Sequence, residues 1–182
     1  PLGYGNSPYQ PYSSFAGDDI YISVDKLVAD GLLNQSDAVE FKSNATIVDY
    51  GAVRSHKTNM LQTAFANFMS NSQLKAELDA FVAKTSWAYN YAVFVTFKKA
   101  NQHKAWNLWP SEYKSWIKDK KLDLSAYKEQ IDYELFLQFI FSRHWLELKA
   151  YANSKNIEIM GDIPIYLGFD SLDVWENQDM FL

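Results

Sequence analysis

The chain has 182 residues, a formal net charge of −5 and no cysteine. This length suffices for one domain with a hydrophobic core, or for part of a larger one. The lack of cysteine excludes disulfides and thiolate zinc sites, and the scattered basic residues argue against a nucleic-acid partner. The longest apolar stretch, AYNYAVFVTF, is far shorter than the ~20 residues of a membrane-spanning helix, and no signal peptide opens the sequence. We therefore expect a cytoplasmic protein with no membrane partner.

Residues 1–19 are rich in the turn-forming residues Gly, Pro, Ser and Asn, which predicts a loop. The segment also contains Tyr9 and Tyr12, whose rings would order it against a surface. We therefore predict a structured functional loop instead of a flexible linker. A helix is expected to begin after Ser23, which can cap it, and Gly31 can end its first turns.

The middle of the chain, residues 41–121, is predicted to be helical. Leu61 and Phe65 belong to an amphipathic helix, and Ser70 with Gln73 has the spacing of a capping box for the next helix.

The stretch SWAYNYAVFVTFKKA, residues 86–100, fits two kinds of secondary structure. Val93 and Val95 favour a strand, whereas Trp87 and Tyr91 lie on one face of a helix. We predict a helix because charged residues follow without a turn signal.

A long helix is expected over residues 132–153, followed by a buried strand. The apolar stripe of the helix consists of Leu135, Phe139, Leu146 and Ala150. After a short loop comes the apolar run 157–160, which is bounded by Gly and Pro and predicts a buried strand. A helix, a short loop and a buried strand together form one unit of an α/β fold.

Asp162 follows the predicted strand after Gly161. Burying an ionised carboxylate inside a strand is costly unless it is paired. We therefore place Asp162 at the carboxyl end of the strand, where α/β folds bind ligands. Asp170 and Asp173 follow on the same loop, and two carboxylates ~5–10 Å apart would suit glycoside chemistry. Aspartates at such positions also cap helices, and the residues leave both interpretations open.

Other kinds of site find no support in the sequence. It contains no Gly-rich phosphate loop and no serine nucleophile elbow. The histidines, His56, His103 and His144, are far apart in sequence. Aromatic residues make up 16% of the chain; they usually fill a core, but they also form platforms for sugar rings.

Five segments carry a family resemblance. In chain order they read GNSPYQPYSSFAG, VDYGAVRSHK, WNLWPSEY, LQFIFSRHW and GDIPIYLGFDSLDVW. Their order and spacing resemble those of the 4-α-glucanotransferases, the family of bacterial amylomaltase and the plant disproportionating enzyme, over essentially the whole chain. The resemblance implies an α/β fold, part of a (β/α)8 TIM barrel of the α-amylase clan with a mostly helical inserted subdomain. It also implies transfer of α-1,4-glucan segments from maltodextrin donors to glucose or maltodextrin acceptors, with retention through a glycosyl-aspartate and without a metal or cofactor.

The resemblance assigns roles to individual residues. Asp162 resembles the aspartate after the third barrel strand that binds sugar hydroxyls at the cleavage subsite. Tyr9 resembles the aromatic platform of the same subsite, with Ser7 beside it. Asp170 would support the loop, and Trp175 would pack.

The family's catalytic groups do not occur in this sequence. The nucleophile of the family lies in an arginine–isoleucine–aspartate–histidine motif after the fourth strand, and the acid/base glutamate comes later. Neither motif is present, so we expect no catalytic residue here, an internal fragment of a longer enzyme, and no turnover by the 182 residues alone. Asn90 and His144 stand where the family pattern suggests Asp and Gln.

The resemblance also predicts a division into three parts. Residues 1–40 would form a barrel-edge loop and helix, 41–130 a helical inserted subdomain, and 131–182 a barrel helix, strand and active-site loop. Uncovered strand edges and apolar helix faces predict self-association. The alternatives are an α-glucan hydrolase of the same clan, which would share every residue named here, and a non-catalytic helical interaction module.

Overall fold

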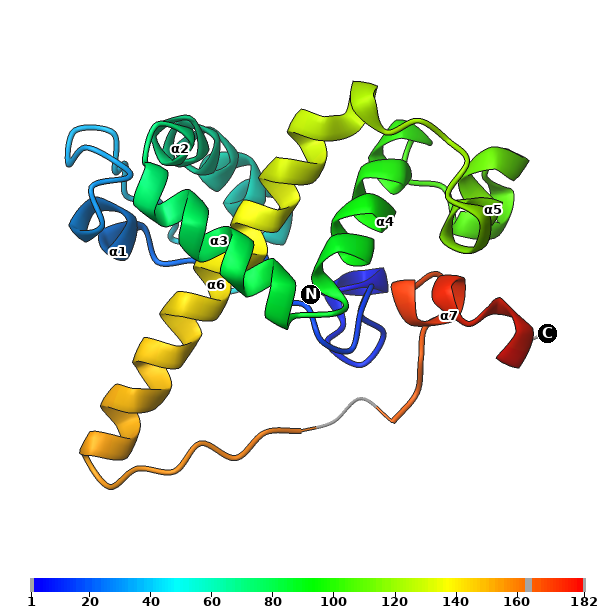
Figure 1. Ribbon diagram of the computed structural model, residues 1–182. Coiled ribbons are helices and arrows are strands. Elements are labelled where there is room, and N and C mark those ends of the chain that lie inside the picture. Colours follow the sequence, from blue (N-terminus) through cyan, green and yellow to red (C-terminus); the bar gives the residue numbers. More distant parts are fainter. Residues whose placement is uncertain (1, 163–164, 182) are drawn as a thin grey trace.

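The computed structural model describes residues 2–162 and 165–181, and helices dominate it (Figure 1). The α-helices are α1 (Val24–Ala29), α2 (Tyr50–Met69), α3 (Ser72–Lys84), α4 (Ala88–Ala100), α5 (Ser111–Asp119), α6 (Lys128–Ser154) and α7 (Leu172–Glu176). Short 3-10 turns lie at Tyr4–Asn6, Asp19–Tyr21, Trp106–Leu108, Ser125–Tyr127 and Gln178–Met180. None of the helices in the described ranges is long and apolar enough to cross a bilayer.

Helix α6 lies between two hydrophobic cores. In Figure 1, α1 lies to the left of α6, α4, α5 and α7 lie to its right, and α3 crosses in front of it. Ile131 and Leu135 of α6 contribute to the core with α4, α5 and α7, whereas Phe136 and Ile140 contribute to the core with the first three helices. Because neighbouring residues on a helix point in different directions, one helix supports both cores.

Aromatic rings fill the core around α4. Trp109 and Trp175 are fully buried. The rings of Trp116 and Trp175 stack with centroids 6.1 Å apart, and the Phe97 ring meets the Tyr113 ring edge-on at 4.9 Å. Core packing is therefore the role of these tryptophans, since rings buried in this way cannot serve as exposed sugar platforms.

Helix α1 confirms the helix predicted to begin after Ser23, and α4 confirms the helix predicted over residues 86–100. The Ser23 hydroxyl accepts a hydrogen bond from the Lys26 N–H at 3.3 Å and caps α1. Gly31 has a φ of +70°, the left-handed conformation that favours glycine after a helix.

The predicted capping box at Ser70 and Gln73 is wrong by one residue. Asn71 caps α3, because its Oδ1 accepts a hydrogen bond from the Leu74 N–H at 3.1 Å. Ser70 instead ends α2, where its own N–H donates to carbonyl groups of that helix. Asn is as good a cap as Ser, so the residue nearer to the new helix takes the role.

The strand predicted at residues 157–160 is not formed in the described part of the chain, which contains no strand. The segment is extended, but Ile157 is 57% exposed and Met160 96% exposed. A strand needs the N–H and C=O groups of a neighbouring strand, and residues 2–162 and 165–181 supply no such partner. No strand of the (β/α)8 barrel is therefore seen in residues 2–162 and 165–181, whereas the predicted helical part is.

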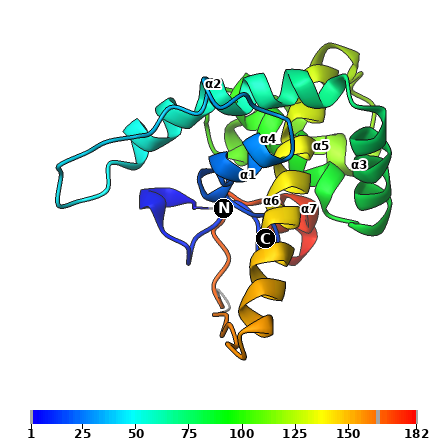
Figure 2. The same cartoon turned by 90° about the vertical axis from the view of Figure 1, so that its left-hand side faces the viewer.

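The apolar stripe of α6 is buried only in its first half. Leu135 and Phe139 are buried, but Leu146 is 60% exposed and Ala150 is also exposed. The end of α6 projects beyond the two cores next to the extended segment (Figure 2), so no described element covers it.

Candidate functional site

Tyr9 and Asp162 lie far apart in sequence and meet in space. The Tyr9 hydroxyl donates a hydrogen bond to Asp162 Oδ2 at 3.0 Å, and both side chains are exposed. This hydrogen bond, together with the negative charge of Asp162, raises the pKa of Tyr9. The phenol therefore stays protonated and donates to the carboxylate, while the exposed ring and the exposed carboxylate are accessible to a ligand.

The loop that carries Tyr9 has a tightly defined backbone. Ser7 Oγ accepts a hydrogen bond from the Tyr9 N–H at 3.2 Å, and Ser7 O accepts one from the Gly3 N–H at 3.1 Å. A Cβ atom on Gly3 would lie 1.6 Å from the carbonyl oxygen of Gln10, so only glycine fits there. Ser7 thus shapes the turn that presents the Tyr9 ring.

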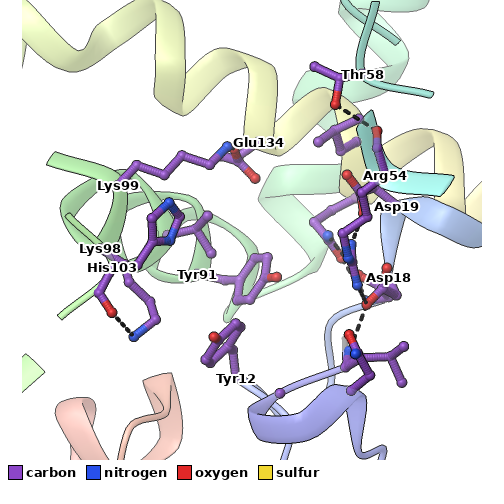
Figure 3. A pocket seen from close by; sticks show the side chains of 17 residues that line it. Tyr12, Asp18, Asp19, Arg54, Thr58, Tyr91, Lys98, Lys99, His103 and Glu134 are labelled. Carbon is purple, nitrogen blue, oxygen red and sulfur yellow. Dashed lines mark hydrogen bonds and ion pairs between the residues drawn. The ribbon is translucent and has the colours of Figure 1, made fainter. Parts of the chain in front are cut away.

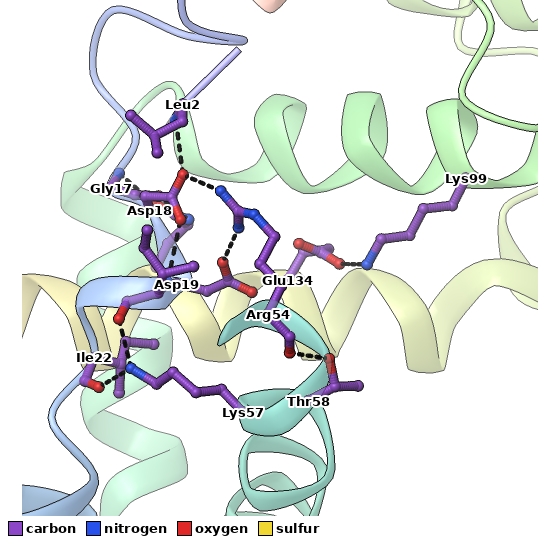
Figure 4. A network of polar contacts seen from close by, with 12 residues as sticks. Leu2, Gly17, Asp18, Asp19, Ile22, Arg54, Lys57, Thr58, Lys99 and Glu134 are labelled. Atoms are coloured by element: carbon purple, nitrogen blue, oxygen red, sulfur yellow. Dashed lines mark hydrogen bonds and ion pairs between the residues drawn. The ribbon is translucent and has the colours of Figure 1, made fainter. Parts of the chain in front are cut away.

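Asp18 ties the beginning and the end of this loop together, and Arg54 of α2 binds Asp18 (Figure 4). Its guanidinium donates to Asp18 Oδ2 at 2.8 Å and to Asp19 Oδ1 at 2.7 Å. Asp18 is buried and also accepts a hydrogen bond from the Leu2 N–H at 2.6 Å. The segment from Leu2 to Asp18 is therefore closed on itself and held by α2.

The two neighbouring acids have opposite pKa shifts. Burial favours the neutral form of Asp18, but the hydrogen bonds from Arg54 and from the N–H groups of Leu2 and Ile20 outweigh burial and lower its pKa. Burial and the negative charge of Asp18 raise the pKa of Asp19 to about 6. Asp18 is thus a fixed anion that binds Arg54, and Asp19 titrates just below neutral pH.

Gln138 of α6 holds the loop from the core side. Its Oε1 accepts from the Gly17 N–H at 2.8 Å, and its Nε2 donates to the Gly17 carbonyl at 3.1 Å. A Cβ atom on Gly17 would come within 2.0 Å of the Phe141 ring. This close approach requires glycine and fixes the loop against α6.

A cavity of about 370 Å³ lies between the loop and the helices (Figure 3). Tyr12 and Tyr91 line it together with three basic side chains, each paired with an acid. These basic side chains are Arg54, bound to Asp18 and Asp19, Lys98, bound to Asp170, and Lys99, bound to Glu134. Because the charges are paired internally, they serve to hold the surrounding segments together.

Asp170 and Asp173 do not cap the next helix, so that interpretation is wrong. Ser171 caps α7 with a hydrogen bond from the Val174 N–H to its hydroxyl at 3.3 Å. Asp170 accepts from the Trp106 N–H at 3.1 Å, and Asp173 accepts from the Ser14 N–H at 3.1 Å. Both carboxylates bind neighbouring segments of the chain.

Trp175, Asn90 and His144, which the family resemblance also singles out, support the fold. Trp175 is fully buried. Asn90 donates to Glu176 Oε1 at 2.6 Å, and His144 Nδ1 accepts from the Ser23 N–H at 3.2 Å. Within residues 2–162 and 165–181, no group of three or more His, Asp or Glu side chains is arranged to hold a metal ion.

Sequence reasoning missed the residues that anchor the loop, namely Arg54, Lys98 and Gln138. The sequence holds one signal for Lys98. It follows Tyr91 and Phe94 at helical spacing, so it lies on a helix face that is otherwise apolar. A lysine in that position is either at the edge of the core or buried with partners. For Arg54 and Gln138 the partners come from distant segments, and nothing local in the sequence identifies them.

Comparisons with known proteins agree on one family. The family model described as 4-alpha-glucanotransferase matches residues 1–182. The chain is 39% identical to the 4-alpha-glucanotransferase of Clostridium butyricum and 37% identical to that of Synechocystis, matching all of this chain but only 38% and 37% of those proteins. The chain therefore spans little more than a third of the length of these relatives.

The same similarity holds in three dimensions. The solved structure of amylomaltase from Streptococcus agalactiae in complex with acarbose matches 98% of this chain and 37% of that protein, with a TM-score of 0.90 and 31% identity.

Proposed function

This chain belongs to the 4-alpha-glucanotransferase family, and we propose that it supplies part of the glucan-binding surface of such an enzyme. The observation that carries the proposal is the hydrogen bond between Tyr9 and Asp162. It joins an exposed aromatic ring to an exposed carboxylate, which is a combination suited to a sugar ring. The flat face of tyrosine packs on the C–H groups of the sugar, and an ionised carboxylate accepts hydrogen bonds from two hydroxyls.

In this proposal the chain binds the donor glucan and does not break the glycosidic bond. Tyr9, with Ser7 shaping its loop, and Asp162 would hold the sugar next to the bond that is cleaved. The nucleophile and the acid/base carboxylate, which retaining glycosidases place ~5 Å apart, would come from sequence outside these residues. The complete protein would transfer α-1,4-glucan segments between maltodextrins with retention of configuration.

We further propose that residues 157–160 are the third strand of a (β/α)8 barrel. Their extended backbone and exposed apolar side chains suit a strand whose neighbours come from elsewhere in the protein. Asp162 would then lie at the carboxyl end of that strand, where barrel enzymes bind their substrates. The division at residues 40 and 130, and the cytoplasmic location, stay predictions from the sequence.

A chimeric enzyme tests the proposal. Residues 1–182 replace the aligned segment of the Clostridium butyricum relative, and the purified chimera is incubated with maltotriose. We expect glucose together with maltodextrins longer than maltotriose, because transfer moves glucan segments onto acceptors. The 182-residue chain alone should leave maltotriose unchanged.

The two alternatives predict other products. A hydrolase of the same clan would release only glucose and maltose, since water would be the acceptor. A folded chimera without any activity on maltotriose, combined with no binding of maltoheptaose to the 182-residue chain, would leave the non-catalytic helical module as the better interpretation.

A further inference from the structure

Lys98 is a buried lysine in the last turn of α4. Its side chain is only 4% exposed, and its ammonium group pairs with the carboxylate of Asp170. The same group lies 3.4 Å from the His103 carbonyl oxygen and 3.3 Å from that of Lys104. It also lies 4.9 Å from the centre of the Tyr12 ring. Every contact offers negative charge or π-density, so the buried cation is well satisfied.

Two partners of Lys98, Tyr12 and Asp170, belong to the two segments that carry the proposed glucan site. Tyr12 lies three residues after Tyr9, and Asp170 lies eight residues after Asp162. The Leu172 N–H donates to the Tyr12 carbonyl at 2.8 Å, and so joins the same two segments next to the ammonium group.

The turn after α4 is part of the same junction. Asp170 accepts a second hydrogen bond from the Trp106 N–H at 3.1 Å. The indole N–H of Trp106 donates to the Phe169 carbonyl at 2.7 Å. Lys98 is therefore the group that contacts the Tyr12 segment, the Asp170 segment and this turn at once.

The cost of burying the charge indicates a specific role for Lys98. Removing an ammonium group from water costs several kcal/mol, and an apolar residue in the same place is often as stable or more so. In some proteins a buried ion pair specifies one arrangement of its partners, whereas apolar cores tolerate several packings. Tyr9 and Asp162 are exposed and joined by one exposed hydrogen bond, so their relative position depends on more deeply buried contacts.

We propose that Lys98 is a positioning residue, whose buried ammonium group fixes the segment carrying Tyr9 relative to the segment carrying Asp162. It touches neither sugar-binding side chain and acts through Tyr12 and Asp170. The identity of the ligand rests on the proposed function, whereas the geometry around Lys98 does not.

The experiment measures that geometry directly. The chain has no cysteine, so two introduced cysteines can be labelled specifically. We choose Gln10→Cys, at an exposed side chain beside Tyr9, and Gly161→Cys, where an added Cβ atom meets nothing within 4 Å. Nitroxide labels at these sites report the distance between the two segments by pulsed electron paramagnetic resonance.

The double-labelled chain is compared with and without Lys98→Met, which removes the charge and keeps a long side chain. We expect a single narrow distance distribution with Lys98 and a clearly broader one with Met. Lys99→Met is the matched control, because Lys99 is the next residue on α4 but pairs with Glu134 at 2.5 Å. It should leave the distribution narrow.

Binding of maltoheptaose, measured by calorimetry on the unlabelled chains, is the second measurement. We expect Lys98→Met to weaken binding by about tenfold, which corresponds to the loss of one well-placed hydrogen bond to the ligand, and Lys99→Met to leave binding unchanged. If even the unsubstituted chain does not bind maltoheptaose, the proposed function fails, but the distance measurement still decides the role of Lys98.

An unchanged distance distribution in a folded Lys98→Met chain would overturn the proposal, whatever happens to the affinity. If Lys98→Met does not fold by circular dichroism, Asp170→Asn replaces it, because that change removes the charge of the partner and keeps its size. The same broadening is then expected. Loss of folding in both variants would also overturn the proposal, since Lys98 would then be required by the fold as a whole.

Discussion

At the scale of single residues, the proposed site combines the neutral phenol of Tyr9 with the carboxylate of Asp162. The carboxylate raises the pKa of the phenol by accepting its proton in a hydrogen bond. Tyr9 is therefore neutral, and its ring face keeps its full apolar character for a sugar. Asp162 presents an exposed carboxylate that can accept a hydrogen bond from a sugar hydroxyl. Removing the Tyr9 side chain should therefore affect glucan binding differently from removing the Asp162 side chain.

Substitution of Tyr9 separates the ring from the hydroxyl. Tyr9→Phe should weaken maltoheptaose binding by about threefold, because one hydrogen bond is lost, whereas Tyr9→Ala should weaken it by about tenfold or more, because the stacking surface is lost. Calorimetric titration measures both. Tyr151→Ala removes another exposed tyrosine, on α6, and should change nothing; equal losses for the Phe and Ala variants would contradict the platform role.

Asp19 predicts a dependence of stability on pH. Its pKa is about 6 in the folded chain and about 3.9 when unfolded, so the folded state holds the proton more tightly between these pH values. The unfolding free energy should therefore fall as the pH rises from about 4 to about 6, and then stay level. We expect the unfolding free energy to fall by ~1 kcal/mol over this range. This is less than the full pKa shift of Asp19 implies, because its side chain is about one-third exposed and its charge is screened by water.

Asp19→Asn is the control for this titration. Chemical unfolding of both chains at a series of pH values gives the difference in unfolding free energy. That difference should move in favour of the Asn variant as the pH rises through this window. A difference that is the same at every pH would show that Asp19 does not titrate there.

At the scale of secondary-structure elements, single side chains cap the N-termini of α1, α2, α3 and α7. The boundary between α2 and α3 is an example, because Ser70 and Asn71 are both good capping residues and only one of them caps α3. The hydrogen bond from the Leu74 N–H goes to Asn71. Substitutions at the two positions should therefore have unequal effects.

Asn71→Ala should lower the unfolding free energy by ~1 kcal/mol, the usual cost of losing a side-chain cap. Ser70→Ala should cost less than ~0.5 kcal/mol, as expected for a surface substitution that removes no such contact. Urea denaturation of both variants checks this prediction. The reverse order would restore the capping box that the sequence suggests.

The elements differ in how well the sequence predicts them. Helices such as α1 and α4 are predictable because the Ser23 cap of α1 and the apolar face of α4 are local in sequence. The segment 157–160 has the composition of a strand, but composition cannot supply the neighbouring strand that pairing requires. The first half of α6 is buried as its stripe predicts, and the second half is not, because no described element packs on it.

The candidate site is also predictable only where its signals are local in sequence. The apolar run before Asp162 already points to a ligand-binding role for that residue, the family resemblance adds Tyr9, and the structure brings the two together. Arg54 and Lys98 were missed, because each acts through partners that are distant in sequence. Such partners are set by the tertiary fold, which one sequence read alone does not reveal.

At the scale of the whole molecule, exposed apolar side chains gather on the end of α6 and on the extended segment that follows it. The exposed side chains are Trp145, Leu146, Leu148, Tyr151, Ile157, Ile159 and Met160. An apolar surface of this kind promotes association when nothing covers it. The self-association predicted from the sequence should therefore use this surface.

Sedimentation velocity over a range of concentrations tests this prediction. The unsubstituted chain should associate increasingly with concentration. A variant with Leu148→Lys and Ile159→Lys, two exposed positions, should stay monomeric. A chain that is monomeric at every concentration, or a variant that associates equally well, would contradict the prediction.

The central claim is that α-1,4-glucan binds where Tyr9 and Asp162 meet. The most direct measurement is a map of amide chemical-shift changes in the isotope-labelled 182-residue chain during titration with maltoheptaose. We predict changes that cluster at residues 7–10 and 161–162. Shifts that cluster elsewhere, for example around Arg54 in the cavity, or a spectrum that does not change at saturating maltoheptaose, would contradict the claim.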